Sequence, residues 1–150
     1  MSTSRDLYDG IAALMVAGVT GTSYTPDGIT INGGITRKNL PATPDKITAL
    51  NVVIQGDDIT MPRSQVMVQL RARGLPNDPI GPDEMLDAFK EILHGTTNLV
   101  MGATTVIQMN RKIRVPMGMD QASKRWEAID QYYLDVDVAP TAVQPVQGSW

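Results

Sequence analysis

Regular alternation of apolar and polar side chains along Gln65–Arg73 constrains the fold more than any other stretch of this sequence. Successive side chains of a β-strand point to opposite faces of the sheet. One face would carry Val66, Val68, Leu70 and Ala72, and the other Gln65, Met67, Gln69, Arg71 and Arg73. The pattern therefore predicts a half-buried strand, which Gly74 ends.

An amphipathic helix is predicted directly after this strand, over Asp83–Leu93. Pro82 fits the first helical position, where its missing N–H leaves no hydrogen bond unmade. Asp83 and Glu84 lie in the first turn, where the helix dipole favours negative charge. The apolar residues recur at helical spacing: Met85, Leu86, Phe89, Ile92 and Leu93. We expect the helix to pack on the apolar face of the strand through Leu86, Phe89 and Leu93.

The remaining patterns predict a second helix and several further strands. Leu7, Ile11, Leu14 and Met15 form a helical stripe that ends at Gly18, and Thr3 with Asp6 approximates a capping box. Strands are predicted at Ile29–Ile31, Ile47–Gln55, Thr96–Met101, Thr104–Val115 and Trp126–Val138. Pro116 is expected to close the fourth of these, and the second is expected to form a hairpin with Gln65–Arg73. This order predicts an α+β fold: a mixed, mostly antiparallel sheet flanked by two helices.

Length and composition predict one domain over residues 1–140, followed by a mobile tail over 141–150. The chain of 150 residues has no cysteine, so disulfides and thiolate metal sites are excluded. The chain has a net charge of −3, so it lacks the general excess of basic residues that is typical of a nucleic-acid-binding protein. The longest apolar run, Ile11–Val19, is too short to span a bilayer. Thr36–Lys46 holds two prolines and no periodicity, which predicts an exposed loop that is functional or mobile.

Residues with catalytic or metal-binding potential are few. His94 is the only histidine, so it has no second imidazole with which to form a zinc site. Asp135 and Asp137 share one strand face and offer oxygen ligands to a divalent cation, although a solvated polar strand face is the simpler explanation. We therefore expect no catalytic residues, no metal and no cofactor. A metal-dependent binder or enzyme that uses these two aspartates, with His94, is the alternative of another class.

Charged side chains on two predicted strands suggest contacts outside the core. Arg71 and Arg73 share the polar face of one strand, and Asp135 and Asp137 share the polar face of the last. If the strands are neighbours, the charges would pair across the sheet. Otherwise the arginines would form a basic patch that contacts an adjoining subunit or passing DNA. A merely solvated face is the third interpretation.

Two segments resemble the small minor capsid and tail-completion proteins of long-tailed bacteriophages. The first is Val68–Gly74 (VQLRARG), followed by a proline-rich turn and a helix that ends in Leu93-His94-Gly95. The second is Arg125-Trp126-Glu127, followed by YYLDVD at Tyr132–Asp137. The order of helices and strands is similar to that of the tail terminator proteins, a sheet flanked by helices.

This resemblance implies a structural virion protein without enzymatic activity. A tail terminator forms a hexameric ring on the end of the tail tube, stops tube growth and offers the head-joining surface. The implied partners are copies of the chain itself, the tail tube protein, the head–tail connector and DNA that passes through the ring. The implied location is the head-proximal end of the virion tail, after assembly in the host cytoplasm. Another connector or minor capsid role is the alternative. Expected interface residues are Arg37, Lys38, Arg71, Arg73, Asp135, Asp137 and Trp150.

Overall fold

The computed structural model describes residues 3–24, 32–58 and 63–137. Within them the chain forms two helices and seven strands: α1 (Thr3–Gly18), β1 (Ser23–Tyr24), β2 (Gly34–Arg37), β3 (Ile47–Asp58), β4 (Arg63–Arg73), α2 (Gly81–Leu93), β5 (Thr96–Met101), β6 (Thr104–Met119) and β7 (Trp126–Asp137). None of the helices described is long and apolar enough to cross a membrane.

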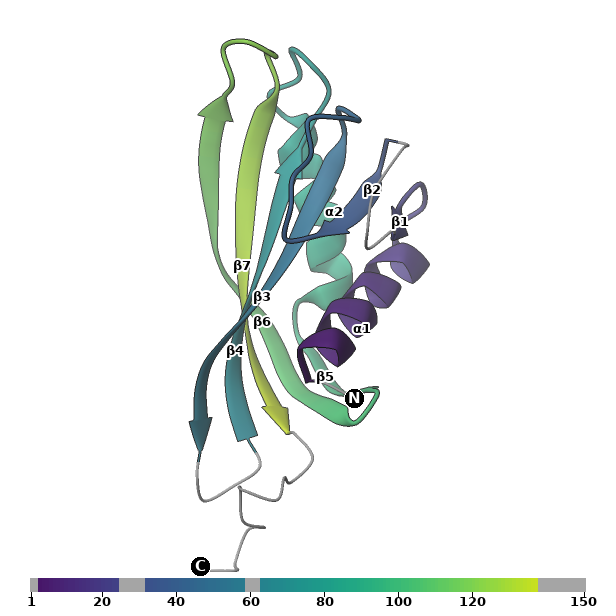
Figure 1. The fold of residues 1–150 in the computed structure, drawn as a ribbon, viewed down its shortest axis with the longest axis vertical. Coiled ribbons are helices and arrows are strands. Elements are labelled where there is room, and N and C mark those ends of the chain that lie inside the picture. Colours follow the sequence, from purple (N-terminus) through teal and green to yellow (C-terminus); the bar gives the residue numbers. More distant parts are fainter. Residues whose placement is uncertain (1–2, 25–31, 59–62, 138–150) are drawn as a thin grey trace, which may run out of the picture.

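All seven strands belong to one sheet, in the order β1-β2-β3-β4-β7-β6-β5. The β1/β2 and β2/β3 pairs are parallel. The pairs β3/β4, β4/β7, β7/β6 and β6/β5 are antiparallel. Both helices lie on the same face of the twisted sheet (Figure 1). The protein therefore has the predicted α+β fold, with a mixed and mostly antiparallel sheet.

The hydrophobic core lies between this face of the sheet and the two helices. On β4 and β7 the residues that face the helices are those of the predicted alternation and its equivalent on β7: Val66, Val68, Leu70, Ala72, Ala128, Tyr132, Leu134 and Val136. The α2 side chains Leu86, Phe89 and Leu93 are at most 1% exposed. Their predicted packing on the strand is therefore confirmed. The opposite face of the sheet carries no helix (Figure 1).

The predicted hairpin of β3 and β4 is confirmed, and both strands extend further than their patterns indicated. β4 also pairs along its whole length with β7, which comes last among the described strands. Since β4 has a partner on both sides, its backbone N–H and C=O groups are satisfied within the sheet. β4 is thus the central strand on which the helices pack.

β6 differs from its prediction because it continues through Pro116 to Met119. β5 pairs only with Thr104–Met109, so the later part of β6 is an edge strand, where proline is tolerated. Register shifts at three places along the β6/β7 pair explain why the sequence showed no clean alternation. The bulged register places Arg111 opposite Tyr132 and Arg114 opposite Asp130, on the side of the helices.

The N-terminal edge of the sheet was not predicted correctly. β2 (Gly34–Arg37) overlaps the start of the predicted loop Thr36–Lys46, and the loop that follows the strand is therefore Lys38–Lys46. The predicted strand Ile29–Ile31 lies outside the described residues. Gly33 has φ of +89°, and a Cβ there would lie 2.2 Å from the carbonyl oxygen of Gly21. Only glycine allows the chain to pass so close to that carbonyl.

Asp6 has a different role from the capping box that its position suggested. Its side chain is 7% exposed and accepts hydrogen bonds from the Ala103 N–H at 3.2 Å and the Thr104 hydroxyl at 3.4 Å. The carboxylate thus holds the first turn of α1 against the turn that joins β5 and β6. A residue at the start of the described chain is bonded to one 97 positions later.

Candidate functional site

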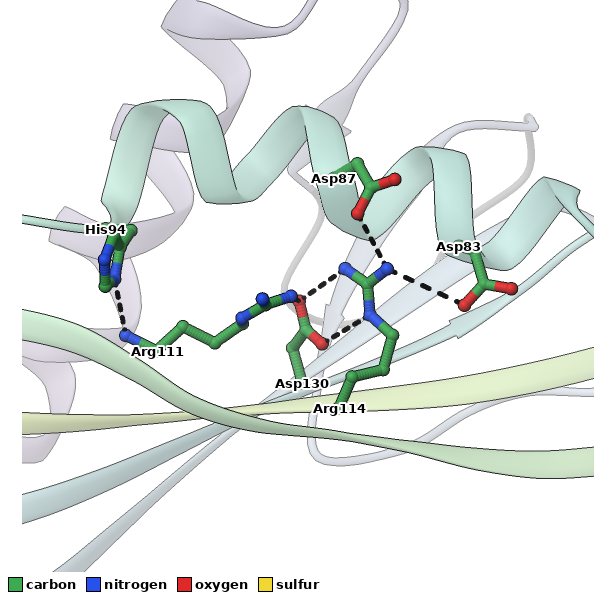
Figure 2. Close-up of polar contacts among 6 residues, drawn as sticks. All are labelled: Asp83, Asp87, His94, Arg111, Arg114 and Asp130. Atoms are coloured by element: carbon green, nitrogen blue, oxygen red, sulfur yellow. Dashed lines mark hydrogen bonds and ion pairs between the residues drawn. The ribbon is translucent and has the colours of Figure 1, made fainter.

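A cluster of charged residues fills the space between α2 and the strands β6 and β7 (Figure 2). Asp130 on β7 is fully buried, and the Arg114 guanidinium on β6 donates two hydrogen bonds to its carboxylate, at 2.7 and 2.9 Å. Arg114 also donates to Asp87 of α2 at 2.7 Å and lies 3.7 Å from Asp83. The cluster therefore joins the helix to two strands through one guanidinium.

Arg111 completes this arrangement on the side of the helix C-terminus. Its guanidinium lies 3.8 Å from the Asp130 carboxylate. Its backbone N–H donates to Nδ1 of His94 at 2.9 Å (Figure 2). His94, the only histidine, thus accepts a main-chain hydrogen bond just beyond the end of α2. The imidazole fixes the path of β6 at one of its bulges.

Electrostatics fixes the protonation states of two groups in this region, Arg114 and Tyr132. The hydrogen bonds from Arg114 to Asp130 are the main reason that the pKa of Arg114 lies above its ordinary value. Burial raises the pKa of Tyr132, whose hydroxyl has no hydrogen-bond partner among the described residues. Both groups therefore keep one protonation state throughout the physiological range.

A polar groove of about 440 Å³ lies on the other face of the sheet, the face without helices. Lys38, Asn39 and Leu40 line one side, and the rest of the groove is lined by residues of β3, β4 and β7: Ala49, Asn51, Gln69, Arg71, Arg73, Glu127 and Ile129. Arg71 forms an ion pair with Glu127 at 2.6 Å and its side chain remains 45% exposed. The structure thus brings together Lys38, Arg71 and Arg73, which the sequence had suggested separately.

The loop Lys38–Lys46 is held against the sheet by two arginines. Arg73 is only 4% exposed and donates to the carbonyl oxygens of Asp45, at 3.0 Å, and Pro44, at 2.7 Å. Burial lowers the pKa of Arg73. Arg125 donates to the carbonyl oxygen of Ala42 and to the Asp45 carboxylate. A segment that we expected to be functional or mobile is therefore anchored along the side of the groove.

We expect Arg73→Leu to release this loop, because Pro44 and Asp45 would lose the donor that holds their carbonyl groups. The predicted loss of unfolding free energy is about 1–3 kcal/mol. Hydrogen exchange of the amides in Lys38–Lys46 should accelerate more than exchange in β7. Arg71→Leu, on the same strand face, is the matched control and should leave the loop unchanged. Equal exchange rates in both variants would contradict the anchoring role.

Arg37 lies apart from the groove residues. Its guanidinium pairs with Asp9 of α1 at 3.2 Å and donates through Nε to the Tyr24 hydroxyl at 2.6 Å. The guanidinium carbon also lies 5.9 Å from the centre of the Tyr24 ring. These contacts join α1, β1 and β2, so Arg37 has a role within the fold whether or not it also contacts a partner.

The predicted pairing of Arg71 and Arg73 with Asp135 and Asp137 does not occur. β4 and β7 are neighbours, but their antiparallel register places Arg71 opposite Ile129 and Arg73 opposite Glu127. Asp135 lies opposite Gln65, near the other end of the sheet. Within the described residues no group of three or more histidines or carboxylates could hold a metal ion. Trp150 and the rest of the predicted tail over 141–150 lie outside the described residues.

Sequence reasoning missed the buried cluster, although one signal was present. Asp130 falls on the same alternating face of β7 as Tyr132, Leu134 and Val136, so the alternation places its carboxylate on the core side of the strand. Its partner Arg114 could not be placed, because the bulges of β6 move it to the helix side. Glu127 was missed as well, since its ion pair with Arg71 depends on the β4/β7 register.

The fold and the groove define an α+β protein in which one sheet face is covered by helices and the other is open. No protein-family model matches the chain, and no curated protein matches it. A solved structure described as "Virion of native gene transfer agent (GTA) particle" contains a chain with a similar fold. The TM-score is 0.55 at 13% sequence identity, and the match covers 89% of this chain and 90% of that one. This likeness concerns the fold.

Proposed function

We propose that this protein is a structural component of a phage-like virion. The observation that carries the proposal is the fold shared with a chain of the gene transfer agent virion over 89% of the sequence. The two sequence segments that resemble phage tail-completion proteins support the same class of protein. The charged cluster under α2 also fits a structural role, since its cations and carboxylates are engaged with one another.

Within this class, the best-supported role is that of a tail terminator. The protein would form a ring, a hexamer by the resemblance, at the head-proximal end of the tail tube. There it would bind the tube protein on one side and the head–tail connector on the other, with DNA passing through the opening. A ring built from head-to-tail contacts needs two different matching surfaces on each subunit. The open sheet face and the helix-covered face supply two such different surfaces (Figure 1).

Termination would then follow from geometry and would require no catalysis. A tube grows because its last ring exposes the same surface as every ring before it. A ring of a different protein covers that surface and presents another one in its place. Growth stops, and the new surface is available to the connector. The chain's own contribution is a rigid subunit whose α2 is joined to the sheet by Arg114.

Addition of the purified protein to a polymerising tube protein from the same genetic neighbourhood tests this role. We expect shorter tubes, with a ring at one end in electron micrographs, and a multi-subunit mass in solution. A chelator should change neither result. Tubes grown with an unrelated protein of the same net charge provide the control. Unchanged tube length with binding to the connector would favour the connector role, and a monomer stabilised by a divalent ion would favour the metal-dependent alternative.

A further inference from the structure

Oppositely charged surfaces lie on the two sides of this subunit. On the helix side, α2 exposes a row of carboxylates at Glu84, Asp87 and Glu91, opposite its buried residues Leu86, Phe89 and Leu93. On the open sheet face, the polar groove carries Lys38, Arg71 and Arg73 with a single carboxylate, Glu127. A protein with a net charge of −3 thus has a locally cationic groove.

The carboxylates of α2 differ in how far they are already engaged. Asp87 accepts a hydrogen bond from Arg114 and is therefore already engaged in the cluster, although its side chain remains 62% exposed. Glu84 and Glu91 are exposed and form no ion pair within the part of the chain that the structure describes. Spacing of seven residues places these two glutamates on one side of the helix, two turns apart. They are available to a partner.

The cations of the groove are similarly divided. Arg73 is buried and holds the loop through Pro44 and Asp45. Arg71 shares its charge with Glu127 but stays 45% exposed, and Lys38 is exposed without an ion pair among the described residues. Lys38 and Arg71 are therefore the two groove cations that an acidic partner could reach.

The groove and the N-terminal end of α2 lie at the same end of the sheet. β4 ends at Arg73, and Gly74 donates its N–H to the Trp126 carbonyl oxygen at the start of β7. The chain then crosses to the helix side and begins α2 at Gly81. Glu84 and Arg71 consequently lie near the same end of the sheet, but on its opposite faces. Complementary patches in this arrangement match each other between successive copies related by rotation about one axis.

We propose that the occupant of the cationic groove is α2 of a second copy of this chain, with Glu84 and Glu91 of one subunit facing Lys38 and Arg71 of the next. The inference rests on the proposed ring and names the contact that closes it. Electrostatic complementarity fixes the register of such a contact and excludes wrong pairings. It also makes the assembly sensitive to salt.

Two charge-reversed variants test the contact by sedimentation or mass photometry. Arg71→Glu alters the groove, and Glu84→Lys with Glu91→Lys alters the helix. Each should raise the dissociation constant of the oligomer at least about tenfold. Lys112→Glu is the matched control, since Lys112 is an exposed lysine of β6 outside the groove. It should assemble like the wild type. Thermal melts of every variant report whether the subunit itself is folded.

Mixing the two purified variants gives the sharpest result. In an alternating ring the reversed groove meets the reversed helix, and the other junctions are wild-type pairs. We therefore expect an equimolar mixture to recover the oligomer that neither variant forms alone. Raising salt from about 0.05 M to about 0.5 M should weaken the wild-type ring and the mixed ring alike.

The outcomes separate this inference from the proposed function. A wild-type ring with variants that assemble unchanged, or folded variants that never recover on mixing, would overturn the groove–helix contact and leave the ring in place. A wild-type chain that remains monomeric both alone and with the tube protein would overturn the ring and the contact together. If Lys112→Glu also fails to assemble, the loss of assembly in the other variants is explained by net charge alone, and the groove–helix contact is overturned.

Discussion

Replacement of Phe89 by alanine is expected to lower the free energy of unfolding by about 3–5 kcal/mol. The Phe89 side chain is 1% exposed and lies in the core cluster with Leu86, Leu93 and the helix-facing residues of β4 and β7. Truncation removes the ring's transfer free energy and leaves a cavity that the sheet and helices fill only in part. Urea denaturation, analysed with a common slope, measures the loss.

A change elsewhere on the same helix provides the comparison for Phe89. Glu91→Ala alters an exposed residue and should shift the unfolding free energy by no more than about 0.5 kcal/mol. A loss below about 1 kcal/mol for Phe89→Ala, with the control unchanged, would show that α2 does not pack on the sheet in solution.

The second large effect is expected for Arg114→Met. The variant leaves the fully buried Asp130 carboxylate with only the Arg111 guanidinium, 3.8 Å away. Loss of one partner of a buried ion pair destabilises by about 3–5 kcal/mol, because the remaining charge stays out of water without compensation. Asp87 and Asp83 would lose their link to β6 at the same time. Denaturant melts at neutral pH give the magnitude.

A double variant distinguishes an uncompensated charge from a simple loss of packing. Arg114→Met with Asp130→Asn removes both charges, so we expect it to be more stable than Arg114→Met alone by more than about 1 kcal/mol. Lys112→Met, which removes an exposed cation from the same strand, should change stability by no more than about 0.5 kcal/mol. A double variant less stable than the single one would mean that packing, and not charge, dominates at this position.

Resemblance and fold contribute differently to the functional proposal. The short segments around Val68–Gly74 and Tyr132–Asp137 suggested tail-completion proteins, and neither segment contains a catalytic group. In the structure both form central strands, β4 and β7, whose alternation builds the core. Their similarity to the phage proteins therefore reflects the scaffold. The contacts that would form a ring come from side chains on the open face and on α2.

Local patterns alone determined the central strand and the second helix. Val66, Val68, Leu70 and Ala72 alternate, and Pro82 starts the helix, because side-chain direction and backbone restrictions act over a few residues. The same locality explains the errors at β2 and β6. A four-residue strand has too few positions to show a pattern, and a bulge shifts the alternation by one residue.

Tertiary structure decided everything that depends on which strands become neighbours. The sequence placed Arg71, Asp130 and Asp135 on amphipathic strands. Only the antiparallel register of β4 and β7 decided that Arg71 contacts Glu127, 56 positions away, and not Asp135. The bulges of β6 turned Arg114 toward Asp130. Sheet pairing is chosen by the summed burial of whole faces across distant segments, and a one-residue change of register reverses every side chain. Alternation therefore fixes each strand's two faces, whereas the residues that meet across them are set by the complete sheet.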